Sequence, residues 1–184
     1  RSAQPMTFGY LGRINVEKGV GTLIDAFRRI GPGNWRCLVA GHAMDDSIAR
    51  FKAQAEGLPI EFVGWAKPAE FLSAIDVLAV PSFWAEPSPR TIYEAYAMGV
   101  PVIGAASGGI PELIGEDNTE WLFAPGDDAE LAARLEAVIA RGRGYLPDER
   151  AFQHVIREST SERVAEKYLD LYAELVAERR AAHP

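Results

Sequence analysis

The 184-residue sequence has a single cysteine and three scattered histidines. One cysteine excludes an internal disulfide framework and fits a reducing compartment. Cys37 lies in an apolar run, so we expect an inert, buried thiol. No Cys/His cluster has the spacing of metal ligands, and no Asp-x-Asp occurs. The sequence therefore offers no recognisable metal site.

Long apolar runs and an excess of basic residues are also missing. No stretch approaches the roughly 20 apolar residues that span a bilayer, and the N-terminus lacks the pattern of a secretory signal. The net charge of −7 and the pI near 5.0 provide no basic face for nucleic acid. We therefore expect a cytoplasmic protein that binds no nucleic acid. Its first strand begins almost at once, as if the chain were cut from a longer one.

Several common catalytic motifs are absent. The sequence has no Gly-x-Ser-x-Gly elbow, no phosphate-loop Gly-Lys-Ser/Thr and no Gly-x-Gly-x-x-Gly. The histidines at positions 42, 154 and 183 do not suggest a triad. Hydrolase, kinase-like and nicotinamide-dependent functions are therefore disfavoured.

Short strand-like runs alternate with helical patterns along most of the chain, which is typical of a parallel sheet with crossover helices. With 48% hydrophobic residues the chain can bury one core. We therefore predict one doubly wound, Rossmann-like α/β domain over residues 1–184, with helices on both faces of the sheet. The predicted strands cover residues 6–11, 36–40, 60–64, 77–81, 101–104 and 120–123. The predicted helices cover residues 18–30, 45–56, 68–75, 89–98, 109–115 and 127–141.

The pattern changes after residue 144, where no further strand is predicted. A short helix is expected near residues 148–157, and Ser159-Thr160-Ser161-Glu162 has the form of a capping box for a final helix. The final helix carries an apolar stripe of Val164, Tyr168, Leu171, Tyr172 and Leu175. We expect this stripe to pack against the domain's own sheet; the alternative is that part of it packs on a partner domain.

The loop after the first strand carries residues that suit a ligand, because open parallel sheets bind ligands beyond the carboxyl ends of their strands. Arg13 and Lys18 supply two positive charges, and Gly12 allows a ligand to approach the backbone. This combination suits a diphosphate. The alternative is that both side chains are solvated surface charges and that the glycines serve only the turn.

The loop after residues 77–81 leads into a helix at the same edge. Ser88 is predicted to be its N-cap, with Pro89 at the first helical position. The amides of Arg90 and Thr91 would then be unpaired donors at a helix N-terminus, an anion site supported by the helix dipole. The alternative is that Ser88 and water take these donors and that Arg90 is a solvated side chain.

Two acids, Glu86 and Glu94, lie in this loop and on the helix that follows it. The middle of the helix is apolar apart from Glu94, so we expect a helix buried on most sides. A buried carboxylate is unfavourable without a partner. Glu94 therefore requires either an ion pair with Arg13 or Lys18 or the hydroxyl groups of a ligand. A lone Glu86 in a loop would be solvated.

Glycines and aromatic residues follow other strands at this edge. Gly41 and Gly64 leave room for a flat ligand near the backbone. His42 and Trp65 either contact that ligand or have structural roles. The glycines of Gly108-Gly109-Ile110-Pro111-Glu112 serve either the ligand or only the turn.

Taken together, these motifs resemble the retaining family 4 glycosyltransferases. The resemblance is collinear from about residue 6 to residue 140 and rests on Gly12-Arg13, Lys18-Gly19, Pro81-Ser82, Glu86 to Glu94, Ala97-Met98-Gly99-Val100-Pro101-Val102, Gly108-Gly109-Ile110-Pro111-Glu112 and Phe123-Ala124-Pro125-Gly126-Asp127. Members of that family have two facing doubly wound domains, the GT-B arrangement, with the active site in the cleft. The resemblance implies that this chain is the C-terminal, donor-binding domain and that an N-terminal, acceptor-binding domain is missing.

The resemblance also implies roles for the residues. Arg13 and Lys18 would bind the diphosphate of a UDP-, GDP- or ADP-linked sugar, Glu94 the ribose hydroxyls, and Glu86 would lie beside the transferred sugar. The loop amides after Glu86 would hold the sugar and the distal phosphate. The implied reaction transfers the glycosyl group, with retention, to a hydroxyl of a carbohydrate or lipid-linked acceptor. Arg13, Lys18 and the helix N-terminus would stabilise the departing diphosphate without a metal.

One motif departs from the family. Pro87-Ser88-Pro89-Arg90 stands where Gly-Phe-Gly-Leu is common, and the prolines remove two amide donors. The side chains of Ser88 and Arg90 are candidates to replace them. We expect the chain alone to bind nucleotide without turnover. Peripheral attachment to the inner face of the membrane, if it occurs, would be made by the missing domain. The alternatives are a nucleotide-sugar epimerase and a non-catalytic module that binds sugar nucleotides.

Overall fold

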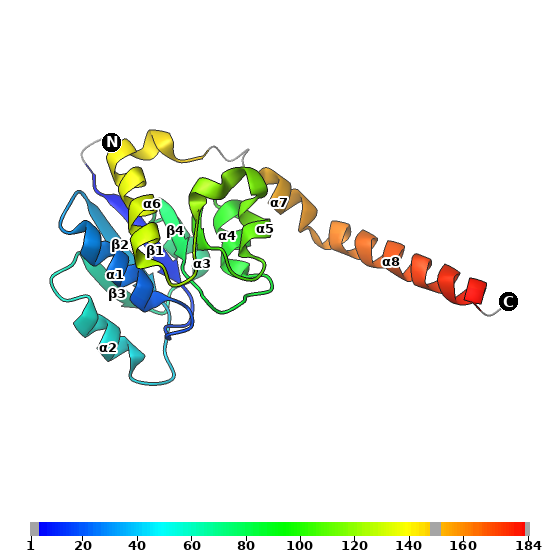
Figure 1. Cartoon of the computed structure of the whole chain (residues 1–184), viewed down its shortest axis with the longest axis horizontal. Coiled ribbons are helices and arrows are strands. Elements are labelled where there is room, and N and C mark those ends of the chain that lie inside the picture. The colour runs from blue at the N-terminus through cyan, green and yellow to red at the C-terminus, as the bar shows by residue number, and fades with distance from the viewer. Residues whose placement is uncertain (1–3, 148–151, 183–184) are drawn as a thin grey trace.

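Six parallel strands form the centre of the computed structural model, which describes residues 4–147 and 152–182 (Figure 1). Their order in the sheet is β3-β2-β1-β4-β5-β6, so the order reverses between β1 and β4. This arrangement confirms the predicted doubly wound α/β fold. The strands are β1 (Met6–Leu11), β2 (Trp35–Ala40), β3 (Ile60–Gly64), β4 (Val77–Val80), β5 (Val102–Ala105) and β6 (Leu122–Phe123).

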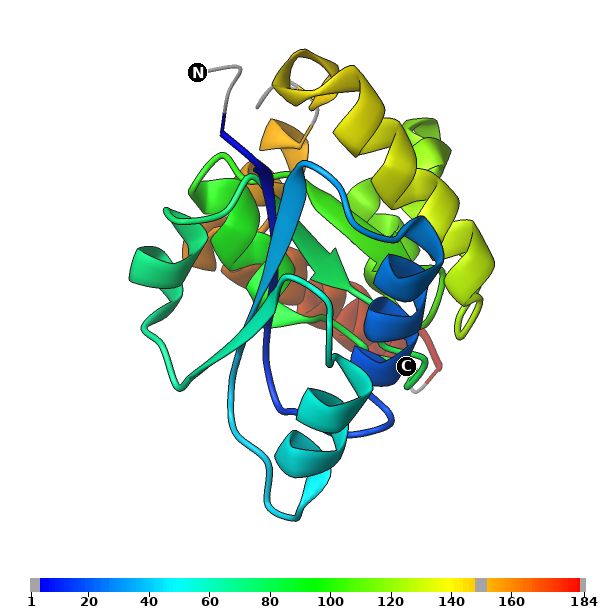
Figure 2. The ribbon, with the colours of Figure 1, turned by 90° about the vertical axis from the view of Figure 1, so that its left-hand side faces the viewer.

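Helices cover both faces of the sheet (Figure 2). Helices α1 and α6 lie side by side on one face, with α2 beside α1, and α3 and α4 lie together on the other face. The helices are α1 (Val20–Ile30), α2 (Ser47–Gln54), α3 (Pro68–Leu72), α4 (Arg90–Ala97), α5 (Ile110–Ile114), α6 (Asp128–Arg141), α7 (Gln153–Glu158) and α8 (Ser161–Ala182), with the 3₁₀ segments η1 (Glu116–Trp121) and η2 (Arg143–Tyr145).

The core lies between these layers because the central strands bury the side chains of both their faces. Helix α1 contributes Leu23, Ala26 and Phe27 from one face, as the helical spacing predicts. The Phe27 ring stacks on Trp35 at 4.2 Å between centroids and meets Phe8 edge-on at 5.4 Å. These contacts fix α1, and therefore the loop that leads into it, against the sheet.

Most element boundaries differ from the sequence prediction by one to three residues. Helix α1 begins at Val20 rather than residue 18, because Gly19 adopts the left-handed conformation (φ 73°) just before it. Residues 120–121 belong to η1, which precedes β6, and are not part of the strand.

The C-terminal segment is helical, as predicted. The expected helix over 148–157 corresponds to α7, although residues 148–151 lie outside the described part of the chain. Thr160, not Ser159, caps α8, because its Oγ1 accepts a hydrogen bond from the Arg163 amide at 3.2 Å. Ser159 Oγ instead donates to the Val155 carbonyl at 2.5 Å.

Helix α8 projects away from the domain (Figure 1) and buries none of its residues. The expectation that its apolar stripe packs against the domain's own sheet is therefore wrong. Both faces of the sheet are already covered by other helices, which leaves α8 no surface there. Within residues 4–147 and 152–182, no helix combines the length and the apolar character needed to cross a membrane.

Candidate functional site

The loops that follow β1 and β4 meet at the carboxyl ends of these neighbouring strands, where the strand order reverses. A hollow of about 170 Å³ lies between them. Ligands of open α/β sheets bind at such a position. The hollow is lined by Tyr10, Leu11, Gly12, Arg13, Lys18, Ala79, Val80, Pro81, Ser82, Glu86, Pro89, Arg90 and Thr91.

The loop after β1 is held by its own hydrogen bonds and by close packing. The Tyr10 hydroxyl donates to the Arg13 carbonyl at 2.5 Å, and the Lys18 amide donates to Asn15 Oδ1 at 3.0 Å. Burial raises the pKa of the Tyr10 hydroxyl, so this donor stays protonated. Gly19 lies directly against the Pro81 carbonyl, where a Cβ would overlap with the oxygen. Both cationic side chains are therefore carried by a fixed backbone.

The loop after β4 is tied to the loop after β1 through one carbonyl group. The amides of Phe83 and Trp84 donate to the Glu17 carbonyl at 3.2 and 3.3 Å, and Ser82 Oγ lies 3.3 Å from the same oxygen. The Ser107 hydroxyl approaches the Trp84 carbonyl at 3.1 Å from the loop after β5. The two site loops therefore form one unit.

Lys18 and Glu86 form an ion pair inside the hollow. Their side chains are only 19% and 17% exposed, so Glu86 is not the solvated loop acid that it would be in isolation. Ser82 Oγ lies 3.5 Å from the same carboxylate oxygen. Burial and the neighbouring Arg13 lower the pKa of the Lys18 ammonium, against the opposing effect of Glu17. Sequence reasoning missed this pair, because it connects side chains from two loops 68 positions apart.

A pair of glycines supports Glu86 from behind. The Gly109 amide donates to the Glu86 carbonyl at 2.7 Å, and Gly108 has a φ of 56°. A Cβ on Gly108 would overlap with the Glu86 carbonyl oxygen, and one on Gly109 with that of Pro87. These glycines thus pack against the loop that carries Glu86 and do more than close a turn.

Helix α4 begins one residue later than predicted. Pro89 is the N-cap, with an extended backbone (φ −69°, ψ 110°), so the prediction that Ser88 caps the helix is wrong. Ser88 Oγ instead lies 2.9 Å from the Tyr93 hydroxyl and does not line the hollow. The amides of Arg90 and Thr91 remain in the first turn, where an α-helix provides no acceptor. Both residues line the hollow, so an anion bound there could accept hydrogen bonds from these amides.

Glu94 has neither Arg13 nor Lys18 as its partner. It lies on α4 with its side chain 29% exposed, and its Oε1 is 3.5 Å from Arg90 Nη2. The alternative of an ion pair with Arg13 or Lys18 is therefore wrong, because neighbours four residues apart on the helix meet instead. The other alternative, the hydroxyl groups of a ligand, stays a prediction. Helix α4 is also less buried than expected, because its buried residues are Ile92, Ala95 and Tyr96.

Besides Ser88 and Glu94, the predicted binding residues Gly41 and Trp65 also lie outside the lining of this hollow. Gly41 is buried with its φ at 149°, and a Cβ there would overlap with the Gly12 carbonyl oxygen. Its amide donates to the Gly64 carbonyl at 2.8 Å, so Gly41 keeps the ends of three strands close together. Trp65 is 71% exposed beyond β3. A ligand that extends from the hollow toward β3 would be needed for either residue to contact it.

Metal ligands do not gather at this edge. Among the residues that the structure describes, no group of three or more His, Cys, Asp or Glu side chains could hold a metal ion. Cys37 is buried as expected, and burial raises the pKa of its thiol. The charged groups available to a ligand in the hollow are therefore Arg13, Lys18, Glu86 and Arg90.

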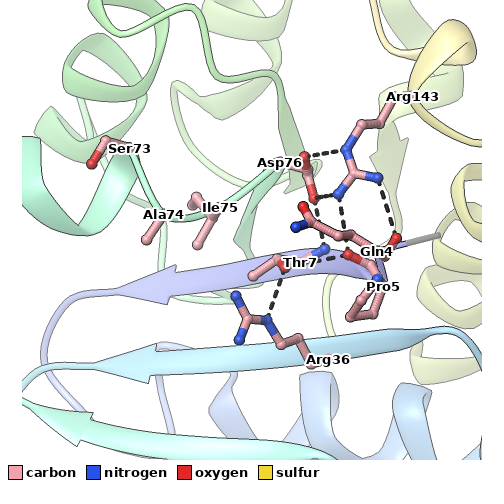
Figure 3. A pocket seen from close by; sticks show the side chains of 9 residues that line it. All are labelled: Gln4, Pro5, Thr7, Arg36, Ser73, Ala74, Ile75, Asp76 and Arg143. Atoms are coloured by element: carbon pink, nitrogen blue, oxygen red, sulfur yellow. Dashed lines mark hydrogen bonds and ion pairs between the residues drawn. The ribbon is translucent and has the colours of Figure 1, made fainter. Parts of the chain in front are cut away.

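A larger hollow, of about 480 Å³, lies at the opposite edge of the sheet, at the amino ends of β1 and β4 (Figure 3). Its main polar groups contact one another. Asp76 accepts hydrogen bonds from Arg143 Nε at 2.7 Å and Nη2 at 2.6 Å, and from the Thr7 amide at 2.8 Å. Arg143 Nη2 also donates to the Pro5 carbonyl at 3.1 Å. These contacts tie η2 to the start of the sheet.

Comparisons with known proteins identify the family. The sequence profile described as "Glycosyl transferases group 1" matches residues 5–141. The amylovoran biosynthesis glycosyltransferase AmsK of Erwinia amylovora is 33% identical over 147 residues, which cover 72% of this chain and 35% of that protein. The sulfoquinovosyl transferase SQD2 of Arabidopsis thaliana is 30% identical over 136 residues, which cover 71% of this chain and 26% of that protein.

A solved structure shows the same fold. Anabaena Alr3699/HepE in complex with UDP and glucose is 25% identical and superimposes with a TM-score of 0.78, over 90% of this chain and 48% of that one. The chain thus spans about half or less of the length of the relatives that it matches. The match to the family profile over most of the chain, together with the shared fold, shows that the chain belongs to the group 1 glycosyl transferases.

Proposed function

We propose that the hollow between the loops after β1 and β4 binds the diphosphate of a nucleoside diphosphate sugar. The proposal is carried by one observation: two cationic residues, Arg13 and Lys18, line the same hollow as Arg90 and Thr91, the first residues of α4. A diphosphate carries the opposite charge and offers acceptors for both kinds of donor. The UDP bound by HepE, which shares the fold, supports a uridine nucleotide as the first candidate.

The remaining residues fit the other parts of such a donor. Glu86 lies in the hollow and would face the sugar attached to the diphosphate, whereas Glu94, one turn along α4, would accept from the ribose hydroxyls. Pro89 has no amide hydrogen, so the donors of Arg90 and Thr91 are the first that the helix offers to the distal phosphate. The Ser88 side chain is engaged by Tyr93 and would have to rotate to reach the sugar.

The reaction that follows is transfer of the glycosyl group to an acceptor hydroxyl, with retention at the anomeric carbon. As the bond to the diphosphate breaks, negative charge grows on the departing oxygen. Arg13, Lys18 and the α4 amides would stabilise that charge in place, and no bound metal is needed for this step. We infer that the acceptor, a carbohydrate or lipid-linked hydroxyl, binds to a domain outside this chain.

Removing either cation is expected to weaken nucleotide binding. A thermal-shift screen of UDP, GDP and ADP first identifies the base, since a ligand at about 100 times its dissociation constant adds roughly 2.7 kcal/mol of stability. Calorimetry then compares Arg13→Ala and Lys18→Ala with the parent chain. We expect each change to raise the Kd about 10- to 100-fold, the loss of one charged hydrogen bond of about 1.5–3 kcal/mol.

The matched control is Lys52→Ala, which removes a positive charge from the exposed side of α2, away from the hollow. Its Kd should stay within about twofold of the parent value, a change below ~0.5 kcal/mol. Unchanged affinity in both Arg13→Ala and Lys18→Ala would contradict the proposed site.

Helix α8 supports the proposal of a partner domain within the same protein. None of its residues is buried. The helix therefore leaves large apolar side chains in solvent, among them Val164, Leu171 and Tyr172, which are between 40% and 56% exposed. The relatives are two to four times longer than the matched region. We therefore propose that α8 packs on the acceptor domain of the longer protein and that the chain alone binds nucleotide without transferring sugar.

Hydrogen exchange tests this arrangement. In the isolated chain the α8 amides should exchange fast, because the helix buries none of its residues, whereas in the longer protein they should be protected at least about tenfold. Equal exchange in both would contradict the docking of α8. Release of the nucleoside diphosphate from the donor sugar by the isolated chain, in the presence of an acceptor, would contradict its dependence on a second domain.

A further inference from the structure

The ion pair between Lys18 and Glu86 occupies the place where the diphosphate is proposed to bind. Both side chains line the hollow and are mostly buried. The ammonium of Lys18 carries one charge, and in this structure it neutralises the Glu86 carboxylate. A diphosphate that binds Lys18 therefore competes with Glu86 for the same cation.

Separating the two side chains by backbone movement would disrupt close packing between the loops. Gly19 holds the Lys18 backbone against Pro81, and Gly108 and Gly109 hold the Glu86 backbone from behind. Any Cβ at these glycines would overlap with a carbonyl oxygen, so the loops are packed as closely as backbones allow. We therefore expect the exchange to take place by rotation of the side chains, with both loops in place.

If Lys18 turned to a bound diphosphate, the Glu86 carboxylate would lose its cationic partner. Its carboxylate would remain mostly buried, with Ser82 Oγ 3.5 Å from one oxygen and a new negative charge nearby. A mostly buried carboxylate without a cation is destabilised. Hydroxyl groups of a sugar attached to the diphosphate could donate to it, whereas the bare diphosphate has none at that end.

We propose that Glu86 is a specificity-determining residue that makes the hollow favour the sugar-bearing nucleotide over the free nucleoside diphosphate, by competing for Lys18. The inference rests on the proposed function. The sugar replaces Lys18 as the partner of Glu86, so the complete donor avoids the unpaired carboxylate. After the sugar has left, Glu86 takes Lys18 back from the diphosphate, which aids release of this product.

The experiment compares the Kd of UDP and of UDP-glucose, by calorimetry, in the parent chain and in Glu86→Gln. Glutamine keeps the shape and can still hydrogen-bond Ser82, but it cannot hold Lys18 by charge. We expect the Kd of UDP to fall about tenfold, equivalent to ~1.4 kcal/mol. The Kd of UDP-glucose should stay the same or rise, so that the preference for UDP-glucose over UDP drops at least about tenfold.

A second background separates competition from simple repulsion between Glu86 and phosphate. If Glu86 acts through Lys18, then Glu86→Gln should change the UDP affinity less than about twofold in a Lys18→Ala chain, so the two changes are not additive. If it acts by repulsion alone, the tenfold gain persists without Lys18, and the inference is overturned.

Glu17→Gln is the matched control, since Glu17 neighbours Lys18 in the chain and is exposed. It removes the same charge without breaking the pair and should change both affinities alike, by less than about twofold. Tighter binding of both ligands by Glu86→Gln, or unchanged UDP affinity, would overturn the inference while leaving the proposed function intact. If the parent chain binds neither UDP, GDP nor ADP, the proposed function fails and this inference with it.

Discussion

Gly19→Ala is expected to destabilise the domain by about 3 kcal/mol or more and to abolish binding at the hollow. Gly19 has a φ of 73°, and a Cβ there would overlap with the Pro81 carbonyl oxygen. An alanine costs about 1–2 kcal/mol in this backbone conformation. The overlap adds a larger cost, because backbone on one side or the other must move. Urea denaturation of the purified variant measures the loss.

Gly57→Ala is the matched control, because it places an alanine in the same left-handed backbone conformation without any overlap of its Cβ with a neighbouring atom. Gly57 lies on the turn after α2 with a φ of 81°, and no atom lies within 4 Å of the position that a methyl group would take there. This variant should lose only about 1–2 kcal/mol and keep its nucleotide affinity. Equal losses of stability in both variants would show that the contact between Gly19 and Pro81 contributes nothing beyond backbone strain.

The central sheet could be predicted from the sequence because its strands are short apolar runs separated by amphipathic helices. All six predicted strands are present, and Leu23, Ala26 and Phe27 of α1 are buried as their spacing requires. This topology also brings the carboxyl ends of β1 and β4 together, since the strand order reverses there. The shared position of Arg13, Lys18 and the α4 N-terminus therefore follows from the fold.

Pairing within the site could not be predicted to the same degree. The sequence places two cations and two acids at one edge of the sheet but does not determine which of them meet. Lys18 pairs with Glu86 because Gly19 and Gly108 bring their loops into contact, whereas Glu94 lies within reach of Arg90 on its own helix. Such choices depend on loop geometry of a few ångströms, which residue types alone do not encode.

The packing of the C-terminal helix also could not be predicted from the sequence. An apolar stripe reports that a surface is to be covered, but it does not identify the covering surface. The stripe on α8 could pack on the domain's own sheet or on a partner domain. Only the arrangement of α1, α3, α4 and α6 over the sheet shows that no surface is left there for α8. Helix ends pose a similar problem: Ser88 suits an N-cap, yet the extended Pro89 takes that position.

Arg143→Ala is expected to lower the free energy of unfolding by about 2–3 kcal/mol without changing nucleotide affinity. The variant leaves Asp76, whose side chain is 20% exposed, without its cation, and it frees the Pro5 carbonyl. Breaking a fully buried pair costs about 3–5 kcal/mol, and partial exposure reduces this figure. Arg29→Ala removes a similar pair with Asp128 on the surface, where Arg29 is 55% exposed, and should lower the free energy of unfolding much less than Arg143→Ala does.

The comparison also tests which hollow binds nucleotide. The larger one, at the amino ends of the strands, is lined by Asp76 and Arg143 (Figure 3). The smaller one, at the carboxyl ends, is lined by Arg13 and Lys18. If the larger hollow only joins η2 to the sheet, Arg143→Ala should reduce the urea midpoint while the Kd of UDP stays within about twofold at temperatures where the variant is folded. A UDP affinity that falls with Arg143→Ala as much as with Lys18→Ala would instead move the binding site to the opposite edge of the sheet.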